Sequence, residues 1–455
     1  MIELLTTIDS IVWGPAMIAL LLGTHIYLTF RTGFIQRKLP QAIRMSVRRD
    51  PSGKGDISSF GALATALAAT IGTGSIVGVA TALLAGGPGA IFWMWVIAFF
   101  GMATIYAEAT LAIQTRQKSD DGSYKGGPVY YITTAFKGGF GKFLAGFFAV
   151  AIILALGFMG CMVQSNSIGS TFETAFGVPS WIVGIVLVVI CGFIFVGGVQ
   201  RLASVTEKLV PIMAVIFLVG GLGVLAARIQ YIPATFAMIF QYAFQPQAII
   251  GGAFGYALKE AISQGAKRGL FSNEAGMGST PHAHAQANVT DPHDQGVVAM
   301  IGVFMDTFVV LTLNALVVIS TLYTPGGPLA ECGAAAASQV LNKTNLAQTA
   351  FGSVFGAEAG AMFVAICLFF FAFSTILSWN LFGKINVVYL FGKKGAVVYS
   401  ILALGFIFLG TVTGSDFVWE LTDMFNNLMV IPNAIALFAL TGLVVRTTHG
   451  VGVKK

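Results

Sequence analysis

Apolar residues fill long stretches of this chain, and polar residues gather in the short segments between them. Most of the stretches are close to the ~20 residues that an α-helix needs to cross the hydrocarbon core of a membrane. They lie near residues 10–30, 58–85, 88–115, 143–168, 180–198, 207–227, 244–266, 296–322, 358–384, 395–414 and 419–445. The pattern predicts an all-α, polytopic membrane protein with about eleven transmembrane helices.

The composition supports lipid as the solvent. Only 10% of the residues are charged, 56% are hydrophobic and the mean hydropathy is +0.83. A soluble protein would carry about a quarter charged residues. We therefore expect membrane lipid to surround the chain. The four cysteines are scattered without metal-ligand spacing, which indicates packing residues.

Lysine and arginine indicate the orientation, because cationic loops stay in the cytoplasm. The linker after the first stretch holds seven of them between Arg31 and Lys54. Alternating sides from there places most other cations, including Lys267 and Arg268, in the cytoplasm and leaves only Arg228 and Lys343 outside. The N-terminus is then outside and the C-terminus cytoplasmic. The net charge of +6 is explained by this asymmetry, without a nucleic-acid partner.

The first stretch lacks a basic leader and a small-residue cleavage site, so we expect a retained helix rather than a signal peptide.

Two stretches carry glycine clusters at their centres. Residues 69–78 contain Gly72, Gly74 and Gly78, and residues 248–256 contain a second cluster. The two stretches are five helices apart and run in opposite directions, which is typical of an inverted repeat with two discontinuous helices. Close packing through small residues is the alternative reading of both clusters.

The repeat predicts a domain organisation in four parts. These are an extra N-terminal transmembrane helix with a basic cytoplasmic linker (1–57), a first five-helix repeat (58–230), a second, inverted five-helix repeat (231–446) and a cytoplasmic tail (447–455).

Unwound helices suit a zwitterion and a cation together. Free backbone N–H groups at the positive end of a half-helix bind a carboxylate, and free carbonyl groups bind a cation. Substrate sites in such folds lie where the broken helices meet.

Two motifs resemble the alanine or glycine:cation symporter family, the sodium:alanine symporters. One is Gly-Gly-Pro-Gly-Ala-Ile-Phe-Trp-Met-Trp and the residues that follow it (86–101); the other is Gly-Ala-Lys-Arg-Gly-Leu-Phe-Ser-Asn-Glu-Ala-Gly-Met-Gly-Ser (265–279). That family belongs to the group with the five-plus-five inverted-repeat fold of the bacterial leucine transporter.

The resemblance implies Na⁺-coupled symport of alanine or glycine by alternating access, in a prokaryotic plasma (inner) membrane. It implies no enzymatic activity and no organic cofactor, with Na⁺ as the co-transported ion.

The resemblance also implies site residues. Thr73 and Gly74 would hold the substrate carboxylate with Ser75 beside them, and Gly251, Gly252 and Phe254 would face the ammonium group. The tyrosine that related transporters use on the third core helix is not found here, and Gln164 would take over part of its task.

An Na⁺ site would combine the carbonyl of Phe371 and the hydroxyls of Ser374 and Thr375 with carbonyls near Ala68 and Ile71. A small substrate has to be selected by excluding larger ones, since a methylene contributes only about 1–3 kcal/mol. Phe254 and Trp379 are the candidate walls, with core packing as the alternative.

Ionisable residues inside the stretches are functional candidates because their burial is costly. Asp306 suits a cation or a proton, with structural hydrogen bonding as the favoured alternative, and we expect Glu108 to reach the membrane interface. His282 and His284 lie in a predicted cytoplasmic loop without a third metal ligand.

Proton coupling, a channel and a membrane-embedded enzyme are the rival functions. The sequence lacks the repeated filter motif that a channel would need, and its apolar stretches lack the nucleophile and base or the metal ligands that an enzyme would need. The oligomeric state and the preference between alanine and glycine stay open.

Overall fold

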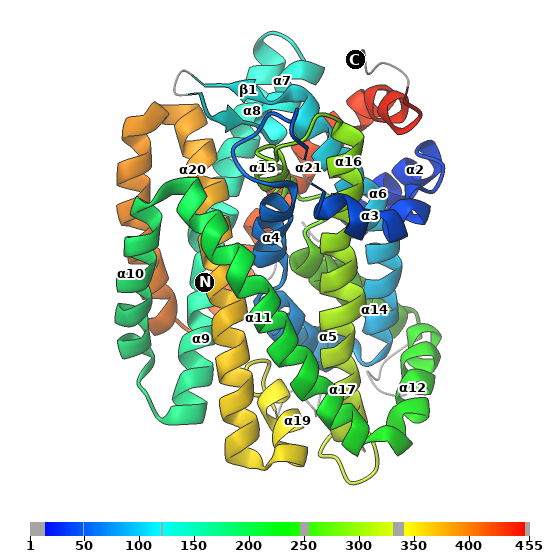
Figure 1. Ribbon diagram of the computed structural model, residues 1–455. Coiled ribbons are helices and arrows are strands. Elements are labelled where there is room, and N and C mark those ends of the chain that lie inside the picture. The colour runs from blue at the N-terminus through cyan, green and yellow to red at the C-terminus, as the bar shows by residue number, and fades with distance from the viewer. Residues whose placement is uncertain (1–13, 49, 120–121, 246–253, 331–340, 451–455) are drawn as a thin grey trace.

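The computed structural model describes residues 14–48, 50–119, 122–245, 254–330 and 341–450, and helices dominate it (Figure 1). The two strands form one antiparallel hairpin, in which Gln117 lies opposite Lys125. In chain order the elements are α2 (Pro15–Arg31), η1 (Ile35–Lys38), α3 (Leu39–Ser46), α4 (Ser59–Thr70), η2 (Gly74–Gly78), α5 (Val79–Gly86), α6 (Gly89–Thr115), β1 (Gln117–Lys118), β2 (Tyr124–Lys125), α7 (Pro128–Ala135), α8 (Gly139–Ile152), η3 (Ile153–Gly160), α9 (Cys161–Phe176), α10 (Ser180–Val196), α11 (Gly198–Ala227), η4 (Ile229–Tyr231), α12 (Ile232–Phe244), α14 (Phe254–Asn273), α15 (Pro281–His284), α16 (Pro292–Val303), η5 (Phe304–Leu311), α17 (Thr312–Leu322), α19 (Leu346–Phe355), α20 (Ala357–Val412) and α21 (Ser415–Thr448).

The helices have the length and apolarity of membrane spans. Six helical stretches in the described part of the chain qualify, or up to eight if each of two bent pairs counts as one span. The 56-residue α20 covers two predicted stretches. Gly392, with a φ of 71°, interrupts the helical geometry between them. The predicted polytopic all-α fold is thus confirmed, whereas the count of eleven helices stays a prediction.

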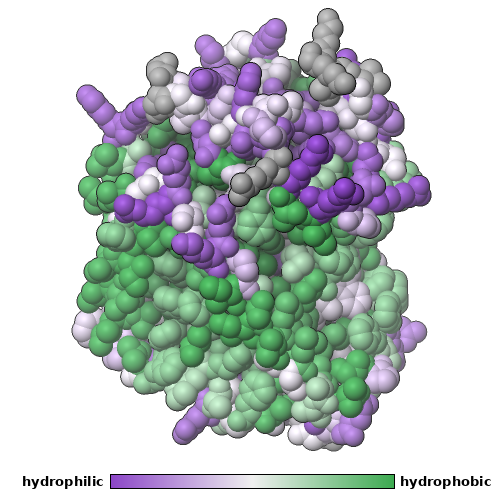
Figure 2. Space-filling model, in the orientation of Figure 1, coloured by the Kyte–Doolittle hydropathy of each residue, from purple (hydrophilic) through white to green (hydrophobic). Residues whose placement is uncertain are grey.

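Apolar side chains cover the middle of the molecule (Figure 2). Large hydrophobic residues are exposed on the helices α10 and α20, among them Phe193, Val196 and Ile401. Hydrophilic residues gather above this belt, at the end that carries α7 and β1. A belt of this kind would be unstable in water, and contact with lipid tails removes the cost.

Within the described ranges, three π-helical segments interrupt the central helices: η2, η3 and η5. Such segments are rare and are frequent at functional sites, because they disturb the regular hydrogen-bond ladder of the helix. Segments η2 and η5 contact each other, and η3 packs on α20. The irregular backbone is therefore concentrated where the central helices meet.

The structure corrects the placement of two cations. Lys267 and Arg268 were predicted to lie in a cytoplasmic loop. In the structure both are buried in α14 and bind Asp423 of α21. The predicted stretch ended at residue 266, whereas α14 continues to Asn273. A hydropathy pattern ends a span at the first charges and does not register that a distant carboxylate compensates them.

Candidate functional site

The helix that begins at Ser59 leaves α-helical geometry after Thr70. Ile71 has φ −79° and ψ 82°, and the two halves, Ser59–Thr70 and Gly74–Gly86, meet at an angle of 45°. We call residues 71–73 the break. The Ser58 hydroxyl accepts the N–H of Gly61 (2.8 Å) and caps the first half. The break thus separates the α-helix α4 from the π-helical η2 and the α-helix α5 within one apolar stretch.

Glycines at the break allow other helices to approach closely. A Cβ atom on Gly72 would lie 2.4 Å from the Thr375 hydroxyl, and one on Gly74 would lie 2.8 Å from the Cα of Ser272. Side chains at these positions would therefore separate the break from α20 and α14. The glycine cluster marks contacts between helices as well as an interruption of one helix.

Gln164 of α9 contacts the break directly. Its Oε1 accepts the backbone N–H of Thr73 at 3.1 Å. Its Nε2 and the Thr73 hydroxyl are buried and have no hydrogen-bond partner among the described residues. A buried polar group without a partner costs about 1–3 kcal/mol. Two such groups beside a free backbone segment indicate a place for a polar ligand.

Four of the five residues expected to bind Na⁺ lie together. The Thr375 hydroxyl is 2.8 Å from the Ala68 carbonyl oxygen and 3.0 Å from that of Phe371. The Ser374 hydroxyl lies 3.4 Å and 2.9 Å from the same two oxygens. Ile71 forms the end of α4 nearby, at the first residue of the break.

Trp379 lies one turn beyond Thr375 and is buried. Its indole N–H donates to the Glu274 carboxylate at 2.5 Å, and its ring would be 2.5 Å from a Cβ atom on Gly160. Gly160 and Gln164 share a face of the π-to-α junction in α9. Thr375 and Gln164 therefore pack against the break at Gly72, and Trp379 packs against Gly160 one turn away.

The remaining predicted substrate residues are placed differently. Ser75 is buried and donates to the Asp306 carboxylate at 2.7 Å. Gly251 and Gly252 lie outside the described residues, as does the predicted break around them. Phe254 begins α14, but its side chain is not described.

Glu274 was missed by the sequence reasoning. It has a positive φ of 58°, and its carboxylate accepts the Ser279 hydroxyl as well as the Trp379 N–H. The signal available in the sequence was its position in the family-like motif 265–279.

Glu108 was predicted to reach the membrane interface. In the structure its side chain is fully buried instead. It accepts the N–H of Gly278 (3.0 Å) and the side-chain amide of Asn433 (2.5 Å). Donors from distant segments satisfy the carboxylate, and the position of Glu108 near the end of a stretch does not reveal them.

His282 and His284 were predicted to lie in a cytoplasmic loop. In the structure both side chains are buried. They lie in the short helix α15, where His282 stacks between Phe148 and Phe382 and binds Asn386 (2.8 Å).

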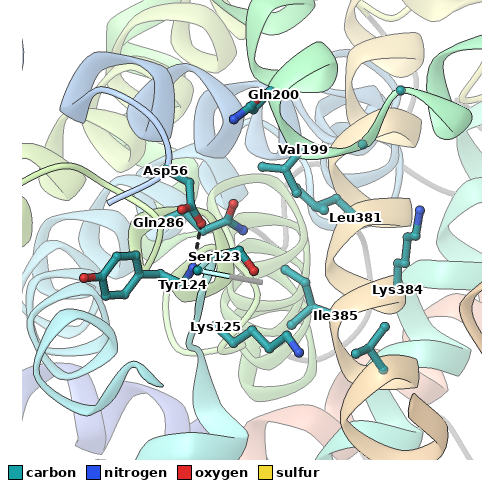
Figure 3. Close-up of a pocket in the computed structure, with 14 residues that line it drawn as sticks. Asp56, Ser123, Tyr124, Lys125, Val199, Gln200, Gln286, Leu381, Lys384 and Ile385 are labelled. Atoms are coloured by element: carbon teal, nitrogen blue, oxygen red, sulfur yellow. Dashed lines mark hydrogen bonds between the residues drawn. The ribbon is translucent and has the colours of Figure 1, made fainter. Parts of the chain in front are cut away.

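The hydrophilic end of the molecule holds a cavity of about 630 Å³ (Figure 3). Asp56 and Gln286 lie on one side, and Leu381 and Lys384 of α20 lie on the other. Asp56 accepts the backbone N–H of Tyr124 at 2.8 Å. The cavity does not include the break, but the segment of α20 that lines it directly follows Trp379.

The fold is that of a multi-pass helical membrane protein, with buried polar groups at its centre. The fold resembles that in the crystal structure of MhsT in complex with L-phenylalanine, with a TM-score of 0.56 and 16% identity over 88% of this chain and 91% of that one.

The chain belongs to the sodium:alanine symporter family, whose sequence model matches residues 1–451. It is 44% identical over 451 residues to the sodium/alanine symporter AgcS of Methanococcus maripaludis, with 98% of this chain and 96% of that protein covered. It is 38% identical over 441 residues to the probable sodium/glutamine symporter GlnT of Bacillus subtilis, covering 96% and 87%. The protein is therefore a cation-coupled amino-acid symporter and not an enzyme.

Proposed function

We propose that this protein imports alanine or glycine together with Na⁺ by alternating access, and that both bind at the break. The observation that carries the proposal is the meeting of Ser374 and Thr375 with the Ala68 and Phe371 carbonyls next to Thr73 and Gln164. Na⁺ prefers oxygen ligands, and two carbonyls with two hydroxyls supply them. The hydroxyls need only rotate to turn their lone pairs toward the ion.

The substrate carboxylate binds at Thr73 and Gly74 in this proposal. In the structure the Gln164 oxygen accepts the Thr73 N–H, as a carboxylate oxygen would. A substrate takes that place, and the unpartnered Gln164 amide and Thr73 hydroxyl then donate to it. Ser75 lies beside this segment and is fixed by its hydrogen bond to Asp306. Gly251, Gly252 and Phe254 face the ammonium group in this proposal.

Trp379 limits substrate size. It is held between Glu274 and Gly160, so it cannot move aside without breaking a buried hydrogen bond. A rigid wall favours alanine and glycine. The relative GlnT is named for glutamine, which makes glutamine the second candidate substrate.

Alternating access rests on the two five-helix repeats, 58–230 and 231–446, moving against each other. The extra N-terminal part (1–57) and the tail (447–455) lie outside the repeats. The cavity beside α20 is the release path on the cytoplasmic side, with the N-terminus outside and the C-terminus in the cytoplasm.

The test is uptake of labelled alanine into proteoliposomes, with Na⁺, K⁺ and pH gradients imposed separately. We expect uptake against a gradient only with Na⁺. Uptake driven by the pH gradient alone would refute Na⁺ coupling, and downhill flux without concentration would indicate a channel.

A double variant tests the ion site. Ser374→Ala with Thr375→Ala is expected to lose Na⁺-dependent uptake. Ser378→Ala is the control, since this hydroxyl lies one turn further along α20 and only donates to the Thr65 carbonyl (2.9 Å). Intact uptake in the double variant would refute the assignment.

A further inference from the structure

A groove of about 520 Å³ lies between the end of α10 and the helix α20, away from the break. The two helices pack on each other along one edge of the molecule (Figure 1). Gly392 divides α20 into two arms, 357–391 and 393–412, and both arms line the groove. Among the described residues, it shares only Lys384 and Val388 with the cavity of Figure 3. The groove is therefore a separate feature, for which the proposed transport site has no use.

The walls of the groove are apolar and face outward. Of the residues that line it, Val196 is 87% exposed, Val397 64% and Ile401 66%. Large apolar side chains on the outside of a membrane protein lie against lipid, because water would make this exposure costly. The groove thus opens toward the bilayer and not toward the centre of the molecule.

Gly192 of α10 leaves a slot in one wall of the groove. A Cβ atom there would meet only the Leu404 side chain, at 3.5 Å, which is ordinary van der Waals contact. Close packing of the two helices therefore does not require glycine at this position. The missing side chain instead leaves space between α10 and the second arm of α20, and a slot with apolar walls fits a hydrocarbon chain.

Positive charge lines the same groove. Lys384 comes from the first arm of α20 and Lys393 from the start of the second, and no carboxylate lines the groove in the described part of the chain. Lys384 is half-buried, and the ion pairs that join described residues do not include it. An ammonium group beside apolar walls is unfavourable without a counter-charge. The groove therefore favours an anion at this point.

The second arm of α20 adds to the positive potential. It begins directly after Gly392, and its first residues, Lys393 and Ala396 among them, line the groove. The start of a helix carries the positive end of the helix dipole and backbone N–H groups without intrahelical partners. Here this helix start lies beside two lysines, so the charged part of the groove has the chemistry that binds a phosphate group.

We propose that the groove binds one anionic phospholipid. Its phosphate lies between Lys384, Lys393 and the start of the second arm, and one acyl chain fills the slot at Gly192 beside Leu404. A zwitterionic lipid fits less well, because its own ammonium group opposes the positive charges of the groove. The attraction of a basic site for anionic lipid is electrostatic, at about 1 kcal/mol for each lysine near the membrane surface.

The lipid would join parts of the chain that are far apart in sequence. It touches α10 and both arms of α20, and its headgroup lies next to Lys384 and Val388, which also line the cavity of Figure 3. A ligand that binds only the folded protein stabilises it by mass action. The lipid therefore stabilises the bend of α20 at Gly392 and the adjoining wall of that cavity.

The test is native mass spectrometry of the full-length protein in detergent. The protein is titrated with phosphatidylglycerol and, separately, with phosphatidylcholine of the same acyl chains. We expect one phosphatidylglycerol per chain to bind about tenfold more tightly than phosphatidylcholine, as the loss of one or two charge contacts implies. Equal affinity for the two lipids would overturn the proposal.

A pair of double variants tests the headgroup site. Lys384→Gln with Lys393→Gln should lower the affinity for phosphatidylglycerol by about tenfold or more. Lys137→Gln with Lys142→Gln is the matched control, since both lysines are exposed at the same end of the molecule but do not line the groove. Unchanged affinity in the first double variant would overturn the proposal. Equal losses in both would do so too, because the lipid would then follow the net charge alone.

Variants of Gly192 test the slot while keeping every lysine. Gly192→Leu should fill the slot and abolish the tight binding of phosphatidylglycerol, whereas Gly192→Ala should retain it, since its Cβ atom makes only ordinary contact. The unfolding temperature without lipid should match the wild type in both variants, which separates a filled slot from misfolding. Tight binding that persists in Gly192→Leu would overturn the placement of the acyl chain.

A second copy of this chain is the other possible occupant of the groove. Lipid-free protein that forms a dimer, and loses it in Gly192→Leu, would assign the groove to that contact and overturn the lipid site. These measurements need neither amino acid nor Na⁺. The lipid site and the proposed function can therefore fail independently of each other.

Discussion

Gly72 shows how little space one residue at the break has. A Cβ atom there would be 2.4 Å from the Thr375 hydroxyl and 3.2 Å from the Gln164 oxygen, so one methyl group would disturb both proposed sites. Overpacking of this kind costs about 1–3 kcal/mol. We expect Gly72→Ala to lower the apparent Na⁺ affinity for alanine uptake by about tenfold or more, measured in proteoliposomes.

Gly78 provides the control in the same interrupted helix. A Cβ atom added there would meet nothing closer than the Thr73 carbonyl oxygen at 3.9 Å. Gly78→Ala should therefore transport almost normally. Equal loss in both variants would mean that the helix needs flexible glycines in general and that the contact at Gly72 is not special.

Trp379 has two separable properties, its size and its N–H group. Trp379→Ala should enlarge the pocket and let larger amino acids, glutamine included, compete with labelled alanine. Trp379→Phe keeps much of the bulk but leaves the Glu274 carboxylate without one donor, at a cost of about 1–3 kcal/mol in stability. Competition assays with thermal unfolding distinguish the two, and unchanged selectivity in the Ala variant would remove Trp379 from the pocket.

The resemblance to the family pointed to the Ser374–Thr375 pair, and in the structure the Thr375 hydroxyl lies 2.8 Å from the Ala68 carbonyl oxygen. The role of the pair as ion ligands stays a prediction. Glu274 could not be assigned in this way, because its partner Trp379 is 105 residues away. Glu108 was misplaced for the same reason.

One buried carboxylate of α21 binds two cations of α14. Asp423 binds Arg268 through both oxygens (3.1 Å and 2.9 Å) and Lys267 at 3.0 Å, and Arg268 lies 5.1 Å from the ring centre of Trp419. Asp423→Asn would remove the negative charge that both buried cations bind. Breaking a buried pair costs about 3–5 kcal/mol, so we expect a marked fall in the unfolding temperature in detergent.

Asp416 supplies the comparison. It binds Lys343 at 2.7 Å, but its side chain is 81% exposed, and exposed pairs contribute at most about 1 kcal/mol. Asp416→Asn should leave the unfolding temperature nearly unchanged. Similar effects of both variants would show that the Asp423 pairs are screened by water and do not hold the helices together.

At the level of elements, hydropathy located most helices but not their irregularities. The apolar stretches at 88–115 and 296–322 match α6 and the helix from α16 to α17, since apolar length is a direct requirement of the membrane. The π-helical segments left no such mark on the sequence, because they change the backbone and not the composition. The separate helix α12 was missed because it is shorter than a span.

One end of the molecule carries more hydrophilic residues than the other (Figure 2). This asymmetry leads to a prediction about the orientation in the membrane. Lys142 at the start of α8 belongs to the end that carries α7 and β1, whereas Glu358 at the start of α20 belongs to the end that carries α19 (Figure 1). Both side chains are exposed. Since cationic loops are retained in the cytoplasm, Lys142 should be inside and Glu358 outside.

Single cysteines at these positions test the orientation in intact cells. The native Cys161, Cys191 and Cys367 are buried and should react little, and Cys332 is replaced by serine beforehand. An impermeant thiol reagent should label Glu358→Cys at once and Lys142→Cys only after permeabilisation. The reverse pattern would contradict the orientation and would place the cavity beside Lys384 on the outer face, where it would admit substrate instead of releasing it. Labelling of both from one side would contradict the arrangement of spans, because a helical segment between them would then fail to cross the membrane.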